Sequence, residues 1–104
     1  MRVKREVVLR PVAVSDLKNL YDFIERESPV SAARYVERIE EYCRKLADFP
    51  ERGTRRDDLR PGLRVVGFRR RVHIAFVVSP ERVEIARILY GGRDLVVAFE
   101  EGTP

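Results

Sequence analysis

The chain has 104 residues, the length of a single domain, and leaves no room for a separate cofactor-binding domain. Hydrophobic residues make up 44% and charged residues 37%, so the chain has enough apolar material for a packed core and is not intrinsically disordered. Its one cysteine, Cys43, and its one histidine, His73, exclude a disulfide framework and argue against metal centres that need several such ligands. We therefore expect one globular domain, residues 1–104, without a cofactor or a metal.

The net charge of +4 is concentrated in one stretch of the chain. Residues 1–51 are neutral overall, residues 52–71 carry +6, and residues 72–104 carry −2. The basic residues of the central stretch are Arg52, Arg55, Arg56, Arg60, Arg64, Arg69, Arg70 and Arg71. Arginine binds carboxylates and phosphates through two parallel hydrogen bonds, so this stretch predicts a surface for an acidic partner. The alternative is that these arginines only keep the protein soluble or pair with its own acids.

Apolar runs in the sequence are short. The longest, residues 74–78 and 95–99, have five residues each, whereas a membrane-spanning helix needs about 20. The basic N-terminus is followed only by the apolar run from Val7 to Leu9, which is too short for a secretory signal. The single cysteine also fits a reducing compartment. We expect a soluble, cytoplasmic protein that does not enter a membrane.

The N-terminal part of the sequence predicts a strand and then a helix. Residues 3–9 are rich in β-branched side chains and stop at Pro11, which indicates a short strand. Apolar residues recur at helical spacing from Ser15 to about Glu27, which predicts the first helix. Asp16 then lies in the first turn, where a carboxylate suits the positive end of the helix dipole.

A second helix is predicted from Ser28 to about Asp48. Ser28 can cap this helix, and Pro29 fits its first position because proline lacks the N–H group that would be unpaired there. Ile39 and Cys43 belong to its apolar stripe, so Cys43 is expected in the core. Because few residues separate the two helices, they must fold back on each other as an antiparallel hairpin.

The C-terminal half predicts a sheet. Residues 50–62 have the composition of a surface loop. Residues 63–68, 72–79 and 82–90 are rich in β-branched and aromatic side chains, and their short connections require an antiparallel meander. Residues 93–99 fit either a short helix or an edge strand. The fold class is therefore α+β, with an N-terminal strand and a two-helix antiparallel hairpin packed on a mainly antiparallel sheet of three to four strands.

Short motifs along the chain occur in a recognisable order. They are Asp16-Leu17, Ser28-Pro29 with Ala32-Ala33, Leu46-Ala47-Asp48-Phe49-Pro50 followed by Gly53, Gly62-Leu63-Arg64, Val83-Glu84-Ile85, Arg87-Ile88-Leu89 and Gly92-Arg93-Asp94. With the order of elements, they resemble the RelE/ParE toxin family of bacterial type II toxin–antitoxin systems, and within it the ParE branch. The likeness covers about residues 5–95. It implies a RelE/ParE-like fold and a small toxin held inactive by a cognate antitoxin.

The two branches of the family imply different activities. ParE-type members are associated with poisoning DNA gyrase, and a ParD-like antitoxin would neutralise the toxin by folding an acidic C-terminal segment onto it. RelE-type members cleave mRNA in the ribosomal A site. The resemblance therefore implies a non-enzymatic gyrase inhibitor without a small-molecule substrate. The alternatives are a ribosome-dependent mRNA endoribonuclease and a basic nucleic-acid-binding module.

An RNA-cleaving toxin of the RelE kind places basic side chains around the scissile phosphate and commonly uses a C-terminal tyrosine for proton transfer. By resemblance, His73 and Arg93 take two of the basic positions. The tyrosine position holds Phe99, which can stack on a base and cannot transfer a proton. Tyr90 is the remaining candidate for that role. The departure at Phe99 favours the ParE branch.

The residues expected to contact the antitoxin or the target are Arg60, Arg64, Arg69, Arg70, Arg71, His73, Arg87 and Arg93. No catalytic or metal-binding residue is expected. His73 alternates with Ala75 on its strand, so it is also explained as a hydrogen-bonded histidine at the sheet surface. Arg87 lies among apolar residues and must either reach a polar binding patch or pair with Glu84 or Asp94.

Overall fold

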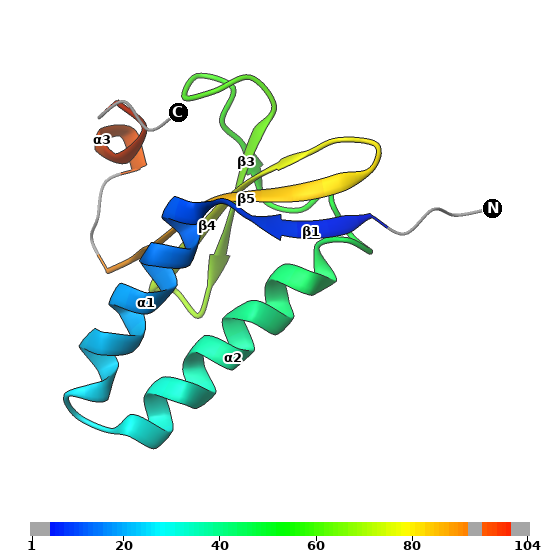
Figure 1. The fold of residues 1–104 in the computed structure, drawn as a ribbon. Helices are drawn as coiled ribbons and strands as arrows, with labels where there is room; N and C mark the ends of the chain where they lie inside the picture. Colours follow the sequence, from blue (N-terminus) through cyan, green and yellow to red (C-terminus); the bar gives the residue numbers. More distant parts are fainter. Residues whose placement is uncertain (1–4, 92–94, 101–104) are drawn as a thin grey trace.

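The computed structural model describes residues 5–91 and 95–100, which contain five strands and three helices (Figure 1). The strands are β1 (Glu6–Leu9), β2 (Thr54–Arg55), β3 (Leu63–Phe68), β4 (Val72–Val78) and β5 (Arg82–Tyr90). The helices are α1 (Pro11–Glu25), α2 (Pro29–Lys45) and α3 (Leu95–Glu100). The strands form one sheet in the order β1-β5-β4-β3-β2, and α1 and α2 form an antiparallel hairpin (Figure 1). The predicted α+β class is confirmed.

The sheet has five strands rather than the expected three to four. β3, β4 and β5 form the predicted antiparallel meander, and β2 adds a two-residue strand in which Thr54 lies opposite Val65. Gly53 permits this close pairing because its φ is +77° and a Cβ atom there would lie 2.2 Å from the Val65 carbonyl oxygen. A strand this short has no periodicity that a sequence could reveal.

β1 is the parallel member of the sheet. It pairs with β5 along its whole length and ends with Leu9 opposite Ile85. The Arg10 N–H group donates one further hydrogen bond, of 3.0 Å, to the Ile85 carbonyl oxygen. Pairing stops there because Pro11 has no N–H group to donate. Beyond Ile85, no strand among the described residues pairs with this edge of β5. Helix α1 lies along the edge instead.

α1 begins at Pro11, earlier than the predicted start at Ser15. Arg10 takes the N-cap position with an extended backbone and makes no side-chain cap hydrogen bond. The predicted start was wrong because it depended on a capping side chain, whereas proline at the first position starts a helix without one. As a result Asp16 lies in the second turn of α1, away from the positive end of the helix.

α2 begins as predicted. The Ser28 hydroxyl accepts a hydrogen bond of 3.2 Å from the Ser31 N–H group, and Pro29 occupies the first turn. Regular helix ends at Lys45 rather than near Asp48. The N–H groups of Leu46, Ala47 and Asp48 bond to carbonyl groups three residues back, so the turn after Lys45 is tighter than an α-helix.

α1 and α2 pack on one face of the sheet. On β4, Val72, Ile74 and Phe76 belong to the larger core cluster, which also contains Ile39 and Cys43 of α2. Cys43 is 1% exposed, and burial raises the pKa of its thiol to about 12. The predicted core position of Cys43 is confirmed.

The opposite face of the sheet carries a smaller cluster. Its buried members are Leu63, Val65, Ala75 and Ala86, and Leu59, Val77, Leu95 and Phe99 pack against them. Residues 95–100 are therefore a helix that partly covers this face rather than an edge strand. Within the described ranges, no helix is both long enough and apolar enough to cross a membrane.

A tight turn joins β3 to β4. The Arg71 N–H group donates a hydrogen bond of 3.3 Å to the Phe68 carbonyl oxygen, and Arg69 and Arg70 have φ values of 50° and 62°. These positive angles are those of a type I′ turn, which suits the twist of a β-hairpin and favours Asn-Gly. A side chain beyond glycine is strained in this region, so two successive arginines carry a conformational cost.

Candidate binding surface

β3 separates the predicted basic stretch into two areas. Arg64 lies near the start of β3, and Arg69 directly follows its end. The extended strand between them places their Cα atoms about 16 Å apart. The stretch that is continuous in sequence therefore forms one basic area near the C-terminal end of α2 and another at the β3–β4 turn.

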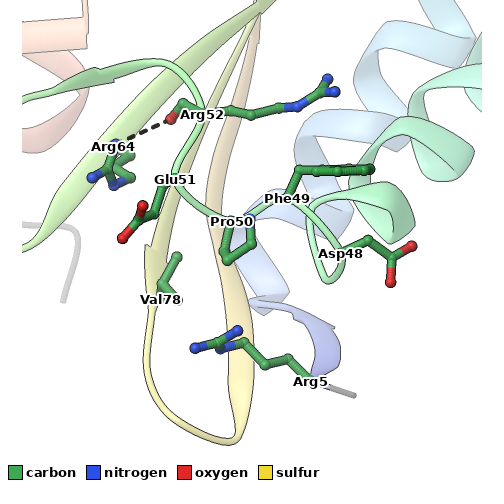
Figure 2. Close-up of a pocket in the computed structure, with 8 residues that line it drawn as sticks. All are labelled: Arg5, Asp48, Phe49, Pro50, Glu51, Arg52, Arg64 and Val78. Carbon is green, nitrogen blue, oxygen red and sulfur yellow. Dashed lines mark hydrogen bonds between the residues drawn. The ribbon is translucent and has the colours of Figure 1, made fainter. Parts of the chain in front are cut away.

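The first area is an open groove of about 610 Å³, which we call the Arg64 groove. Its lining residues are Arg5, Asp48, Phe49, Pro50, Glu51, Arg52, Arg64 and Val78. Figure 2 shows Phe49 and Pro50 in the middle, with Arg5 on one side and Arg52 and Arg64 on the other. Apolar side chains flanked by arginines suit a peptide that carries both apolar and acidic side chains.

The three arginines of the Arg64 groove contact neutral groups. The Arg52 guanidinium lies 5.1 Å from the centroid of the exposed Phe49 ring. Arg64 Nη1 donates a hydrogen bond of 3.4 Å to the Arg52 carbonyl oxygen, and Arg5 Nε donates one of 2.9 Å to the Ser79 carbonyl oxygen. No carboxylate of residues 5–91 and 95–100 pairs with these three arginines. Asp48 and Glu51 also line the groove and offset part of this positive charge without forming an ion pair with these arginines, so the arginine side chains can still pair with an acidic partner.

Two arginines of the basic stretch are paired with neighbouring acids. Arg55 Nε lies 3.1 Å from an oxygen of Asp57, and Arg56 Nη2 lies 2.9 Å from an oxygen of Asp58. A hydrogen bond from the Gly62 N–H group, together with Arg55, lowers the pKa of Asp57. Arg56 lowers the pKa of Asp58 in the same way. For these two arginines, the alternative of pairing within the chain is confirmed.

The second area is the β3–β4 turn, where Arg69, Arg70 and Arg71 are exposed. The Arg69 guanidinium lies 5.4 Å from the centroid of the Phe68 ring and 6.0 Å from that of Tyr35, so it rests against α2. The described part of the chain supplies no carboxylate partner to any of the three turn arginines. Contact between these arginines and a partner remains a prediction.

Arg60 and His73 lie toward the face of the sheet that carries α3. The Arg60 guanidinium is 5.3 Å from the centroid of the Phe99 ring. His73 lies opposite Gly67 on β3 and Leu89 on β5, and it is half-buried. Its Nδ1 atom is buried and has no hydrogen-bond partner among the described residues. His73 is therefore not the hydrogen-bonded surface histidine that the strand alternation indicated.

Arg87 is only 7% exposed. Its Nε and Nη2 atoms donate hydrogen bonds of 2.9 Å and 3.0 Å to the two carboxylate oxygens of Asp16 on α1. Glu84, one of the two partners considered from the sequence, pairs with Arg10 instead. Arg87 thus lies in the interior and not in a polar surface patch, and we remove it from the candidate contact residues.

Arg93 and the motif Gly92-Arg93-Asp94 lie outside the described residues. The contact role of Arg93, and Asp94 as a partner of Arg87, therefore remain predictions. Among the side chains that the structure does describe, no group of three or more His, Cys, Asp or Glu could hold a metal ion.

The sequence reasoning missed the Arg64 groove. Arg5 is distant from Arg52 in the chain and joins it only because Arg5 reaches the turn between β4 and β5 at Ser79. One signal was available: Phe49 is an aromatic residue directly after the predicted second helix, and it is 58% exposed in the structure. Exposed aromatic residues beside arginines are common in protein interfaces.

Comparison with known proteins agrees with this fold. The family model described as "ParE toxin of type II toxin-antitoxin system, parDE" matches residues 7–95. The chain belongs to the ParE toxin family. The ParE branch, indicated by the motifs and by Phe99, is thereby confirmed.

Two similar proteins extend the ParE comparison. Toxin ParE3 of Caulobacter vibrioides is 33% identical over 100 residues, which cover 95% of this chain and 98% of that toxin. A solved structure titled "Chromosomal ParDE TA system from P. aeruginosa" has a TM-score of 0.71 at 24% identity, covering 85% of this chain and 97% of that chain. The sequence match supports the ParE family, and the structural match shows the ParE fold.

Proposed function

We propose that this ParE-family chain acts as a toxin that inhibits DNA gyrase and that a ParD-like antitoxin neutralises it. The observation that carries the proposal is the family match over residues 7–95. ParE-type toxins are associated with gyrase poisoning, and the similar solved structure is titled as a ParDE system, which supports an antitoxin partner for this chain.

The proposed docking site for the acidic C-terminal segment of the antitoxin is the Arg64 groove. Arg5, Arg52 and Arg64 line this groove and have no carboxylate partner among the described residues. Phe49 is exposed at its centre and offers an apolar contact. An acidic segment with apolar side chains would neutralise the charges and cover the ring on folding.

The proposed inhibition requires no chemical catalysis by the toxin. A RelE-type ribonuclease needs a group that transfers a proton, and Phe99 stands at the expected tyrosine position. Its ring lies beside the Arg60 guanidinium, and a phenyl ring has no proton to transfer. We therefore propose a binding inhibitor rather than an enzyme.

Purified toxin incubated with gyrase and relaxed plasmid tests this function. We expect the toxin to block supercoiling or to trap cleaved DNA, and we expect addition of the antitoxin to restore normal supercoiling. Gyrase that works normally in micromolar toxin would contradict the proposed target.

Primer extension on translated mRNA separates the inhibitor from the endoribonuclease. We expect uncut message at toxin concentrations that inhibit gyrase. Specific cuts in ribosome-bound mRNA, with gyrase unaffected, would replace the proposed function by RelE-like cleavage.

A further inference from the structure

A second and smaller pocket, of about 230 Å³, lies between α2 and the β3–β4 turn. Its lining residues are Ser31, Arg34, Tyr35, Arg38 and Arg69, and we call it the Arg34 pocket. Ser31, Arg34 and Arg38 are three and seven residues apart along α2, so they lie on one face of the helix. Arg69 approaches from the turn. Three guanidinium groups therefore surround one small concavity.

These three charges are not balanced by the described part of the protein. The ion pairs formed there involve other arginines, and neither Glu37 nor Glu41 on the same helix pairs with Arg34, Arg38 or Arg69. Like charges around one pocket repel each other unless an anion lies between them. The pocket is therefore arranged to receive an anion.

Tyr35 lines both the Arg34 pocket and a neighbouring pocket that contains Arg71 and Tyr90, and its hydroxyl is unsatisfied. Its oxygen is buried and has no hydrogen-bond partner among the described residues. Burial, as the largest cause, raises the pKa of Tyr35, so the hydroxyl keeps its proton and can donate a hydrogen bond. A buried donor without a partner is costly, and an anion bound beside Tyr35 is one group that can accept this hydrogen bond.

The backbone that presents Arg69 is strained. Arg69 and Arg70 both have positive φ, where a turn optimised for stability would carry Asn-Gly. Strained residues of this kind concentrate at sites that bind ligands. If the pocket binds an anion, the need for a positive charge at position 69 accounts for an arginine at this strained position.

We propose that the Arg34 pocket binds a backbone phosphate of duplex DNA. The two non-bridging oxygens of a backbone phosphate can accept hydrogen bonds from several guanidinium groups. Except for the Tyr35 ring, the lining is polar or charged, unlike the Arg64 groove with its apolar centre. Arg70 and Arg71 extend the positive charge toward adjacent phosphates.

This contact goes beyond the proposed function, because neither the proposed gyrase inhibition nor the proposed antitoxin binding requires the toxin to bind DNA directly. Its test contains no gyrase, so the two proposals succeed or fail independently.

The test measures binding of the full chain to a short fluorescent DNA duplex by anisotropy over a series of salt concentrations. The pocket variant is R34Q/R38Q/R69N. The control variant, R44Q/K45Q/R82Q, removes the same charge at exposed residues outside the pocket. We expect the slope of log affinity against log salt to fall in magnitude by about 1 for the pocket variant, which loses one phosphate contact, and to change by much less for the control.

Circular dichroism and unfolding midpoints show whether both variants fold, and Tyr35→Phe supplies a gentler change. That variant keeps the ring and removes only the unsatisfied hydroxyl, so we expect severalfold weaker DNA binding with stability equal to or above that of the wild type. Equal slopes in the two triple variants, or no DNA binding by the wild-type chain, would overturn the proposal. Pocket-dependent binding of a polyglutamate peptide without binding of DNA would also overturn it, in favour of a protein carboxylate.

Discussion

The Asp16 carboxylate joins α1 to β5 at the point where β1 has ended. It accepts a hydrogen bond of 2.9 Å from the Ile88 N–H group, which has no strand partner among the described residues on that side. It also pairs with Arg87 through both oxygens. Removing two charges from water is costly, and the cost is offset only while the pair is intact. Asp16 and Arg87 therefore depend on each other.

Asp16→Asn is expected to destabilise the fold by about 3–5 kcal/mol, because it removes the negative charge that faces a buried guanidinium. Glu84→Gln is the matched control, since the Arg10–Glu84 pair has 28% side-chain exposure on both partners and is expected to contribute about 1 kcal/mol or less. Urea unfolding of both variants measures the two costs. Equal losses would contradict the special role of Asp16.

Cys43 links stability to alkaline pH. Its pKa is raised from 9.0 to about 12 in the folded chain, so the unfolded thiol ionises first as the pH increases. Its contribution is complete below pH 9.0 and is lost progressively between pH 9.0 and about 12. We expect Cys43→Ala to lose less stability than the wild type between neutral pH and pH 10, measured by urea unfolding at each pH. The same loss in both proteins would exclude this contribution.

At the scale of elements, the β3–β4 hairpin combines a strained turn with a concentration of charge. Arg69 and Arg70 occupy positive φ, and Arg71 completes three adjacent arginines. Local stability favours glycine or asparagine at the first two positions, whereas an anionic partner favours arginine. The arginines therefore give this turn a high positive charge and lower its conformational stability.

Arg70→Gly is expected to raise stability by about 0.5–1 kcal/mol, because glycine removes the strain and only part of the gain is lost to the greater freedom of the unfolded chain. Arg71→Gly is the matched control: it removes the same charge at a position without positive φ, so it is expected to lower stability slightly. Thermal unfolding compares the two variants. A stability gain in Arg71→Gly of the same size would point to relief of charge repulsion instead.

At the scale of the whole molecule, positive charge is divided between two sites of different chemistry. The Arg64 groove combines arginines with Phe49, Pro50 and Val78, whereas the Arg34 pocket is almost entirely polar. A bound peptide needs apolar as well as polar contacts, whereas a bound phosphate needs positive charge and hydrogen-bond donors. The division separates the proposed antitoxin site from the proposed DNA contact.

The double variant R52Q/R64Q is expected to weaken the complex with the antitoxin at least about tenfold, because charge pairs at an interface are costly to truncate. R34Q/R38Q removes the same charge at the other site and is expected to leave antitoxin affinity within about threefold of the wild type. Calorimetric titration of each variant with the antitoxin measures the difference. Equal weakening would show that the antitoxin covers both sites.

The existence of the two long helices, the meander, the start of α2 and the family could be predicted from local sequence alone, whereas residues 93–99 stayed open between helix and strand. Those conclusions rest on local patterns, such as Ser28-Pro29 at a helix start and alternation along β4, which depend on neighbouring residues only. The family motifs are also local, and their order along the chain needs no knowledge of contacts. The start of α1 was misplaced because proline can replace a capping side chain.

The availability of each arginine to a partner depends on contacts between distant parts of the chain. Arg87 and Asp16 are 71 residues apart in sequence, and their pairing depends on where β1 stops along β5. In the same way, the basic stretch was divided by the length of β3, and Arg5 joined Arg52 through a turn distant in the chain. Charge can be counted along a sequence, but the dielectric surroundings and the partner of each charge are set by long-range packing.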